Sequence, residues 1–168
     1  MPKIARRLAT HDESGFTLIE LMVVILIMGI LAAIAIPTFL GARTSAQNKA
    51  AETDLRNLLT SESVAYTNSQ AYASAANLAT LDPAYTKDLT GTKPTINVAT
   101  SASTATTQYV CIWEQSASGE YFGIGDIATG QGAGTYYYSG SSAPSCALTT
   151  TTPPTLSGYH SSATNAGW

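Results

Sequence analysis

Charged residues are scarce in this sequence. Lysine, arginine, aspartate and glutamate make up 11% of its 168 residues, and the formal net charge is −3. A protein that binds nucleic acid through its phosphates needs a basic surface, and this composition does not supply one. We therefore predict no specific nucleic-acid binding.

Residues that carry chemistry are also few. His11 and His160 stand near opposite ends of the chain, where neither suits a positioned general base. The acidic residues Asp82, Asp88 and Asp126 are scattered and do not resemble a calcium loop. We expect the chain not to be an enzyme, with no catalytic residue, no metal site and no cofactor.

The sequence contains two cysteines, Cys111 and Cys146, too far apart for a CxxC redox or zinc motif. Both lie in a region rich in serine, threonine, glycine and tyrosine. That composition suits an extracytoplasmic surface, where a disulfide can form and persist. We infer that the two cysteines pair with each other.

What the sequence does have is one long apolar run, from Phe16 to Leu40. A helix needs about 20 such residues to cross a bilayer core of roughly 30 Å, so this run is long enough to span a membrane. Three basic residues precede it, which predicts that its N-terminal flank stays in the cytoplasm and that the chain after Leu40 lies outside. The polar exceptions within the run are Thr17, Glu20 and Thr38.

The helical pattern continues beyond the apolar run. No glycine or proline interrupts residues 42–66. Apolar residues recur there every three or four positions and form one stripe, with polar residues between them. This spacing predicts an amphipathic helix whose stripe packs against another element. The stripe consists of Ala51, Leu55, Leu58, Leu59, Ala65 and Tyr66.

The rest of the chain predicts a small sheet. Residues 67–106 look like a loop, with a short strand at 95–100, and residues 107–140 contain three segments rich in β-formers. We expect an antiparallel sheet of three or four strands that covers the helix stripe, within a head of residues 41–148. The fold class is α+β, a long N-terminal helix packed on a small sheet. Residues 149–168 are rich in serine and threonine, and we expect a flexible tail.

Two ordinary interpretations of residues 16–40 leave one residue unexplained. A secretory signal peptide with cleavage after Ala35, or a simple membrane anchor, would make this a secreted or membrane-anchored binding protein. Neither has a use for Glu20, because a carboxylate within a membrane span is energetically costly.

The segment from Gly15 to Glu20, GFTLIE, resembles the processing site of type IV prepilins. The continuation LMVVILIMGILAAIAIPTFLGAR is similar to that family too, so the resemblance covers about residues 1–66. It implies that residues 1–15 are a leader peptide that a prepilin peptidase removes after Gly15. It also implies methylation of the new amine of Phe16.

The resemblance assigns further roles. Glu20 would pair with the Phe16 amine of a neighbouring subunit during assembly, and residues 16–40 would form the filament core. Gly29 and Pro37 would weaken the helix between them and allow local melting. The implied partners are other copies of the chain, the prepilin peptidase, and an assembly platform with its cytoplasmic ATPase.

The function that this resemblance implies is that of a structural subunit, the major pilin, of a type IV pilus. The precursor would be a single-pass protein of the cytoplasmic membrane, and the mature subunit would form an extracellular filament for adhesion, twitching motility or DNA uptake. The alternative within the same class is a pseudopilin of a type II secretion system. Major pseudopilins usually carry a C-terminal calcium site of acidic residues, which the sequence after Cys146 lacks.

Overall fold

The computed structural model describes residues 15–81, 96–101, 107–130, 132–148 and 155–161. The chain divides into two units, Met1–Gly41 and Ala42–Trp168. One helix, α1 (Leu18–Ser69), contributes its first part to one unit and its last part to the other. Apart from Gly15, the predicted leader lies outside the described residues.

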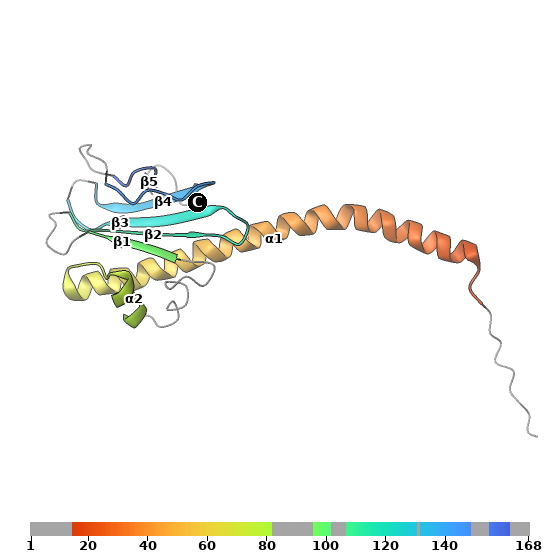
Figure 1. The fold of residues 1–168 in the computed structure, drawn as a ribbon, viewed down its shortest axis with the longest axis horizontal. Helices are drawn as coiled ribbons and strands as arrows, with labels where there is room; N and C mark the ends of the chain where they lie inside the picture. Colours follow the sequence, from red (N-terminus) through yellow and green to blue (C-terminus); the bar gives the residue numbers. More distant parts are fainter. Residues whose placement is uncertain (1–14, 82–95, 102–106, 131, 149–154, 162–168) are drawn as a thin grey trace, which may run out of the picture. The chain divides into compact units, whose positions relative to one another are not determined.

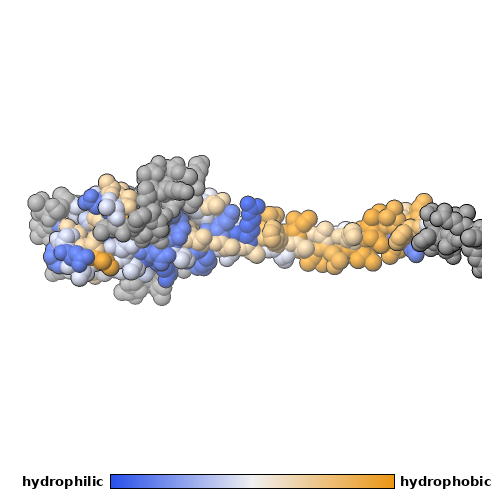
Figure 2. All heavy atoms as spheres, turned by 90° about the horizontal axis from the view of Figure 1, so that it is seen from below, coloured by the Kyte–Doolittle hydropathy of each residue, from blue (hydrophilic) through white to orange (hydrophobic). Residues whose placement is uncertain are grey.

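The first unit contains the apolar part of α1. All side chains from Phe16 to Leu40 are exposed, and Figure 2 shows hydrophobic residues covering this stretch. Among the described residues, α1 is the one helix long and apolar enough to cross a membrane, judged by length and composition. A helix that is apolar all round requires lipid or protein around it.

In the second unit, α1 buries one stripe only, as the spacing predicts. The helix ends at Ser69, slightly beyond the predicted limit at residue 66. Gln70 follows with a φ of 55°, the left-handed conformation that often ends a helix. The buried apolar residues of the stripe are Ala51, Leu55, Leu58 and Ala65, and Leu59 and Tyr66 pack beside them half-buried.

The segment predicted as a loop, residues 67–106, contains two regular elements. A short helix, α2 (Ala75–Leu81), follows α1, and it buries Leu78 completely. Seven residues with one buried anchor are too short to show a helical period, so sequence reasoning missed α2. The short strand suggested near residues 95–100 is confirmed as β1 (Ile96–Thr100). Residues 82–95 and 102–106 lie outside the described residues.

The sheet has five antiparallel strands rather than three or four, in the order β1-β2-β3-β4-β5 (Figure 1). Each strand therefore pairs with its neighbour in the sequence, and β1 and β5 form the edges. The strands after β1 are β2 (Tyr109–Gln115), β3 (Tyr121–Ile127), β4 (Gly134–Gly140) and β5 (His160–Ser161).

The two faces of the sheet pack against different parts of the chain. Side chains alternate between the faces of a strand, and Val110 and Ile112 of β2 join Leu55 and Leu58 of α1 in one core cluster. Cys111, which lies between Val110 and Ile112 in β2, points to the opposite face and belongs to a second core cluster. The expected packing of the sheet on the helix stripe is confirmed.

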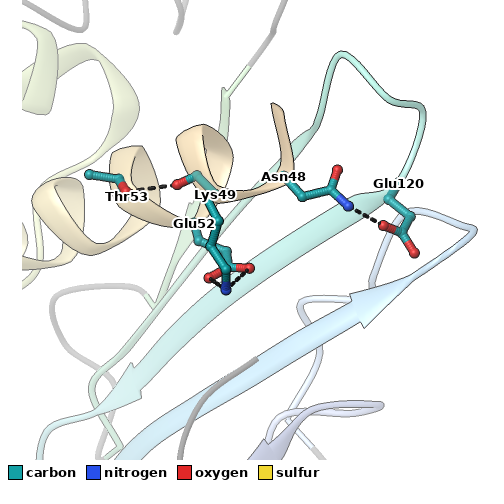
Figure 3. Close-up of polar contacts among 5 residues, drawn as sticks. All are labelled: Asn48, Lys49, Glu52, Thr53 and Glu120. Carbon is teal, nitrogen blue, oxygen red and sulfur yellow. Dashed lines mark hydrogen bonds and ion pairs between the residues drawn. The ribbon is translucent and has the colours of Figure 1, made fainter. Parts of the chain in front are cut away.

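Polar contacts join α1 to the turn between β2 and β3. The Asn48 amide donates to Glu120 Oε2 over 2.5 Å (Figure 3), and the Ser116 hydroxyl donates to Asn48 Oδ1 over 2.9 Å. The next residue, Lys49, donates to both oxygens of Glu52 within α1, at 2.8 and 2.7 Å (Figure 3). The two contacts of Asn48 place this end of the sheet beside the start of the stripe.

The chain after β4 covers the second face of the sheet. Cys146 forms the expected disulfide with Cys111, with 5.7 Å between their Cα atoms. Leu156 and Tyr159 are buried, and the Tyr159 hydroxyl donates to Cys111 Sγ over 3.0 Å. Residues 155–161 therefore differ from the flexible tail expected for 149–168, because Leu156 and Tyr159 anchor them. The remainder of that tail, residues 149–154 and 162–168, lies outside the described residues.

Candidate processing and assembly site

The start of α1 is fixed by a reciprocal pair of side chains, Thr17 and Glu20. The Glu20 backbone N–H donates to Thr17 Oγ1 over 3.3 Å. In return, Glu20 Oε2 accepts the Thr17 backbone N–H at 2.9 Å and the Thr17 hydroxyl at 2.7 Å. This is a capping box, in which two residues at a helix N-terminus satisfy each other's free backbone N–H groups.

The predicted cleavage junction lies just outside this cap. Gly15 and Phe16 precede the helix and are exposed, and the Phe16 side chain is 86% exposed. No other part of the described chain would approach a side chain placed at Gly15 within 4 Å. The junction is therefore non-helical and accessible, as a protease substrate must be.

Glu20 uses only one carboxylate oxygen in the cap. Both hydrogen bonds from Thr17 end on Oε2, and within the part of the chain that the structure describes Oε1 accepts none. The side chain is exposed on the surface of the apolar helix. A carboxylate in apolar surroundings is stabilised by a cation that contacts it, so Oε1 offers a binding position for one.

The two residues expected to weaken the helix lie within α1. Gly29 and Pro37 are both helical. Proline at position 37 cannot donate the hydrogen bond of a normal helical residue, and the neighbouring Thr38 hydroxyl donates to the carbonyls of Ile34 and Ala35, at 3.2 and 2.9 Å. The helix is continuous here, so local melting at Gly29 and Pro37 stays a prediction.

Sequence reasoning missed two features. The capping box was visible as Thr17-x-x-Glu20, a spacing that marks helix starts. The second is Glu62, which is fully buried in the stripe of α1. Its position, four residues after Leu58, places it on the buried face, but the sequence pattern assigns a glutamate to the polar face of an amphipathic helix.

Among the described residues, no group of three or more histidine, cysteine, aspartate or glutamate side chains is placed to hold a metal.

Comparison with known proteins points to the same N-terminal region. Residues 10–36 match the family model described as "Prokaryotic N-terminal methylation motif". The chain is 44% identical over 63 residues to "Type IV major pilin protein PilA" of Myxococcus xanthus, an alignment that covers 38% of this chain and 29% of the relative. The comparison with solved structures found no match.

The same region is similar to proteins of a secretion system. The chain is 43% identical over 47 residues to "Type II secretion system core protein G" of Escherichia coli, covering 28% of this chain and 32% of the relative. It is 46% identical over 45 residues to the protein of that name in Vibrio cholerae, covering 27% and 31%. The chain thus spans less than a third of the length of these curated relatives.

The motif, these relatives and the architecture agree. The predicted cleavage junction, the capped apolar helix and the helix-on-sheet head occur in one chain, and none of the names of these relatives is that of an enzyme. With its N-terminal methylation motif and its α+β fold, the chain is similar at its N-terminus to a type IV major pilin and to type II secretion system core proteins G.

Proposed function

We propose that this chain is the major structural subunit of a type IV pilus. The observation that supports this most is the apolar part of α1, which is exposed on every side and overlaps the methylation motif at residues 10–36. Such a surface is stable only when lipid or protein covers it. The membrane would cover it in the precursor, and other copies of the same helix would cover it in a filament.

Processing converts the precursor into the assembling form. A prepilin peptidase would cleave between Gly15 and Phe16, where the backbone is exposed and not yet helical. Gly15 suits a protease cleft because it has no side chain to obstruct it. Methylation of the Phe16 amine would follow, and the capping box of Thr17 and Glu20 would keep the helix start intact after cleavage.

Assembly would be steered by one charge pair. The new Phe16 amine of one subunit would approach Glu20 Oε1 of its neighbour, the oxygen that the cap leaves available. A contact of this kind joins different surfaces of identical subunits, and it repeats into a helical fibre when its rotation does not close a ring. Burial of the apolar helices would supply the driving force, and the charge pair would set the register.

The cellular setting follows from the order of segments. The basic flank would hold the N-terminus in the cytoplasm. The disulfide between Cys111 and Cys146 supports an oxidising, extracytoplasmic location for the head. An assembly platform in the membrane and a cytoplasmic ATPase would drive extension. The filament would serve adhesion, twitching motility or DNA uptake.

A pseudopilin role is the second candidate, because the N-terminal region is also similar to type II secretion system core proteins G. A pseudopilin would share the cleavage junction and the Glu20 contact. It would form a short fibre within the cell envelope rather than a long surface filament. The two roles therefore differ in filament length and in whether deletion of the gene stops protein secretion.

Filaments sheared from cells test both proposals. Electron microscopy with antibodies against residues 107–146 should show long labelled surface filaments, and N-terminal sequencing of the subunit should begin at methylated Phe16. The same N-terminus without surface filaments, together with a secretion defect on deletion, would support the pseudopilin. A subunit that begins at Ile36 would contradict both, because it would show cleavage of an ordinary signal peptide.

A further inference from the structure

A buried carboxylate closes the corner between α1 and α2. The Glu62 side chain is 0% exposed, and its Oε2 accepts the backbone N–H of Ala73 at 2.8 Å. Its Oε1 is buried and, among the described residues, has no hydrogen-bond partner. Ionising a buried acid whose second oxygen has no partner is costly, because no hydrogen bond replaces the hydration that the carboxylate loses on burial.

A second contact holds the same corner. The Tyr72 hydroxyl donates to Asp126 Oδ2 of β3 over 2.6 Å, and the Tyr72 ring lies 4.9 Å from that of Tyr66. Burial raises the pKa of Tyr72 well above its usual range, and the neighbouring Asp126 adds to this effect. Tyr72 is therefore a neutral hydrogen-bond donor at any ordinary pH.

Within the part of the chain that the structure describes, the titratable groups nearest Glu62 provide no cation to pair with its carboxylate. Tyr66 comes from α1, Tyr72 from the corner and Asp126 from β3, and none of them is a cation. Neither α2 nor β1 contains a titratable residue. The remaining titratable side chains of the described sheet are Tyr109 and Glu114 of β2, Tyr121 of β3, Tyr136, Tyr137 and Tyr138 of β4, and the exposed His160 of β5.

We propose that Glu62 is a pH-responsive latch that holds residues 70–74 against α1 in acid and releases them as the pH rises toward neutrality. In the closed corner Glu62 is protonated, and the neutral side chain is compatible with the apolar residues of the stripe around it. When the corner opens, water reaches Glu62 and the carboxylate can ionise. The surface formed by residues 70–81 of each subunit would then depend on external pH.

The sign of the effect follows from the pKa of Glu62. Burial raises it from an ordinary value of 4.5 to about 7, and the hydrogen bond from Ala73 only partly opposes this. The closed corner therefore binds a proton that the open corner has released between about pH 4.5 and 7. Closure is fully stabilised below this window and weakens as the pH rises through it.

Hydrogen–deuterium exchange of the full chain in detergent micelles tests the latch. After correction for the intrinsic effect of pH on exchange, the opening of residues 70–81 should rise by up to about tenfold per pH unit between pH 5 and 7 and level off above. Glu62→Gln should remove this dependence. A flat wild-type profile would overturn the proposal even if Glu62→Gln fails to fold.

Three control variants separate the latch from other groups. Glu52→Gln removes a buried acid of the same helix that is paired with Lys49, and His160→Asn removes the histidine of β5. Both should keep the wild-type pH dependence. Tyr72→Phe should increase opening at every pH without changing the slope. A slope that is lost in any of these variants would assign the response elsewhere, and neither filament assembly nor processing enters the test.

Discussion

Glu20 uses one of its carboxylate oxygens to cap its own helix, and its other oxygen accepts no hydrogen bond from the described residues. The residue therefore combines a local role, as half of a capping box, with the assembly role that the family resemblance implies. An acid at a helix N-terminus is ordinarily favourable, so the cap alone accounts for a glutamate or a glutamine here. The cap does not require a negative charge among apolar residues, so the charge of Glu20 needs a second explanation.

Conservative substitutions can separate these two roles. Glu20→Gln keeps a side chain that can complete the capping box but removes the charge, whereas Thr17→Ala removes the cap and keeps the charge. We expect Glu20→Gln to be inserted and cleaved normally yet to form few or no filaments, because the Phe16 amine loses its partner. Thr17→Ala should still assemble. Filament yield by shearing, with mass spectrometry of the N-terminus, measures both.

The reverse outcome would be informative. Normal filaments from Glu20→Gln, with poor assembly of Thr17→Ala, would assign Glu20 to helix capping and remove the intersubunit charge pair from the mechanism.

Two glycines of β3, Gly123 and Gly125, leave space for side chains of the C-terminal segment. A side chain at Gly123 would meet the Tyr159 hydroxyl, and one at Gly125 would overlap Leu156. These small residues therefore let the C-terminal segment lie directly on the sheet. In the β3 sequence YFGIGDI the two glycines are two positions apart, so they lie on the same face of the strand, the face that the C-terminal segment covers.

Gly125→Ala should destabilise the head by about 1–3 kcal/mol, the usual cost of overpacking a core. Thermal unfolding of the full chain in detergent, followed by circular dichroism, measures the loss. Leu156→Ala removes the overlapping side chain, so the double variant should lose less stability than the sum of the single variants. Additive losses would show that Gly125 and Leu156 do not share this contact.

At the scale of elements, α1 changes character along its length. Its first part is exposed all round, and its later part buries one stripe against the sheet. The sequence predicts both parts because periodicity over many residues is a strong signal. It does not predict α2, which depends on Leu78 alone, or the burial of Glu62, which depends on how the corner after α1 closes.

The stripe is the element whose packing is most directly testable. Leu58 is fully buried, whereas Val64 on the same helix is 56% exposed. Leu58→Ala should lower the stability of the head by about 2–5 kcal/mol, because it removes buried methyl groups and leaves a cavity. Val64→Ala should change it by no more than about 0.5 kcal/mol. Equal effects on the unfolding midpoint would contradict the assignment of the buried face.

At the scale of the molecule, the head is a sheet covered on both faces, by α1 on one and by the C-terminal segment on the other. The first layer follows from the sequence, since an amphipathic helix needs an apolar partner. The second does not, because a segment rich in serine and threonine predicts disorder. Its place is set by two buried side chains, Leu156 and Tyr159, and by the disulfide that ties the chain before it to β2.

The disulfide should therefore control the stability of the head without affecting the membrane segment. Cys111 and Cys146 are 35 residues apart, a separation for which loop-closure entropy predicts a stabilisation of about 4 kcal/mol. The double variant Cys111→Ser/Cys146→Ser should unfold at a lower temperature and yield fewer filaments, yet remain in the membrane fraction after processing. Reducing the wild-type protein with dithiothreitol should reproduce the lower midpoint and should not affect the double variant. An unchanged midpoint in both experiments would show that Leu156 and Tyr159 hold the C-terminal segment in place without the covalent link.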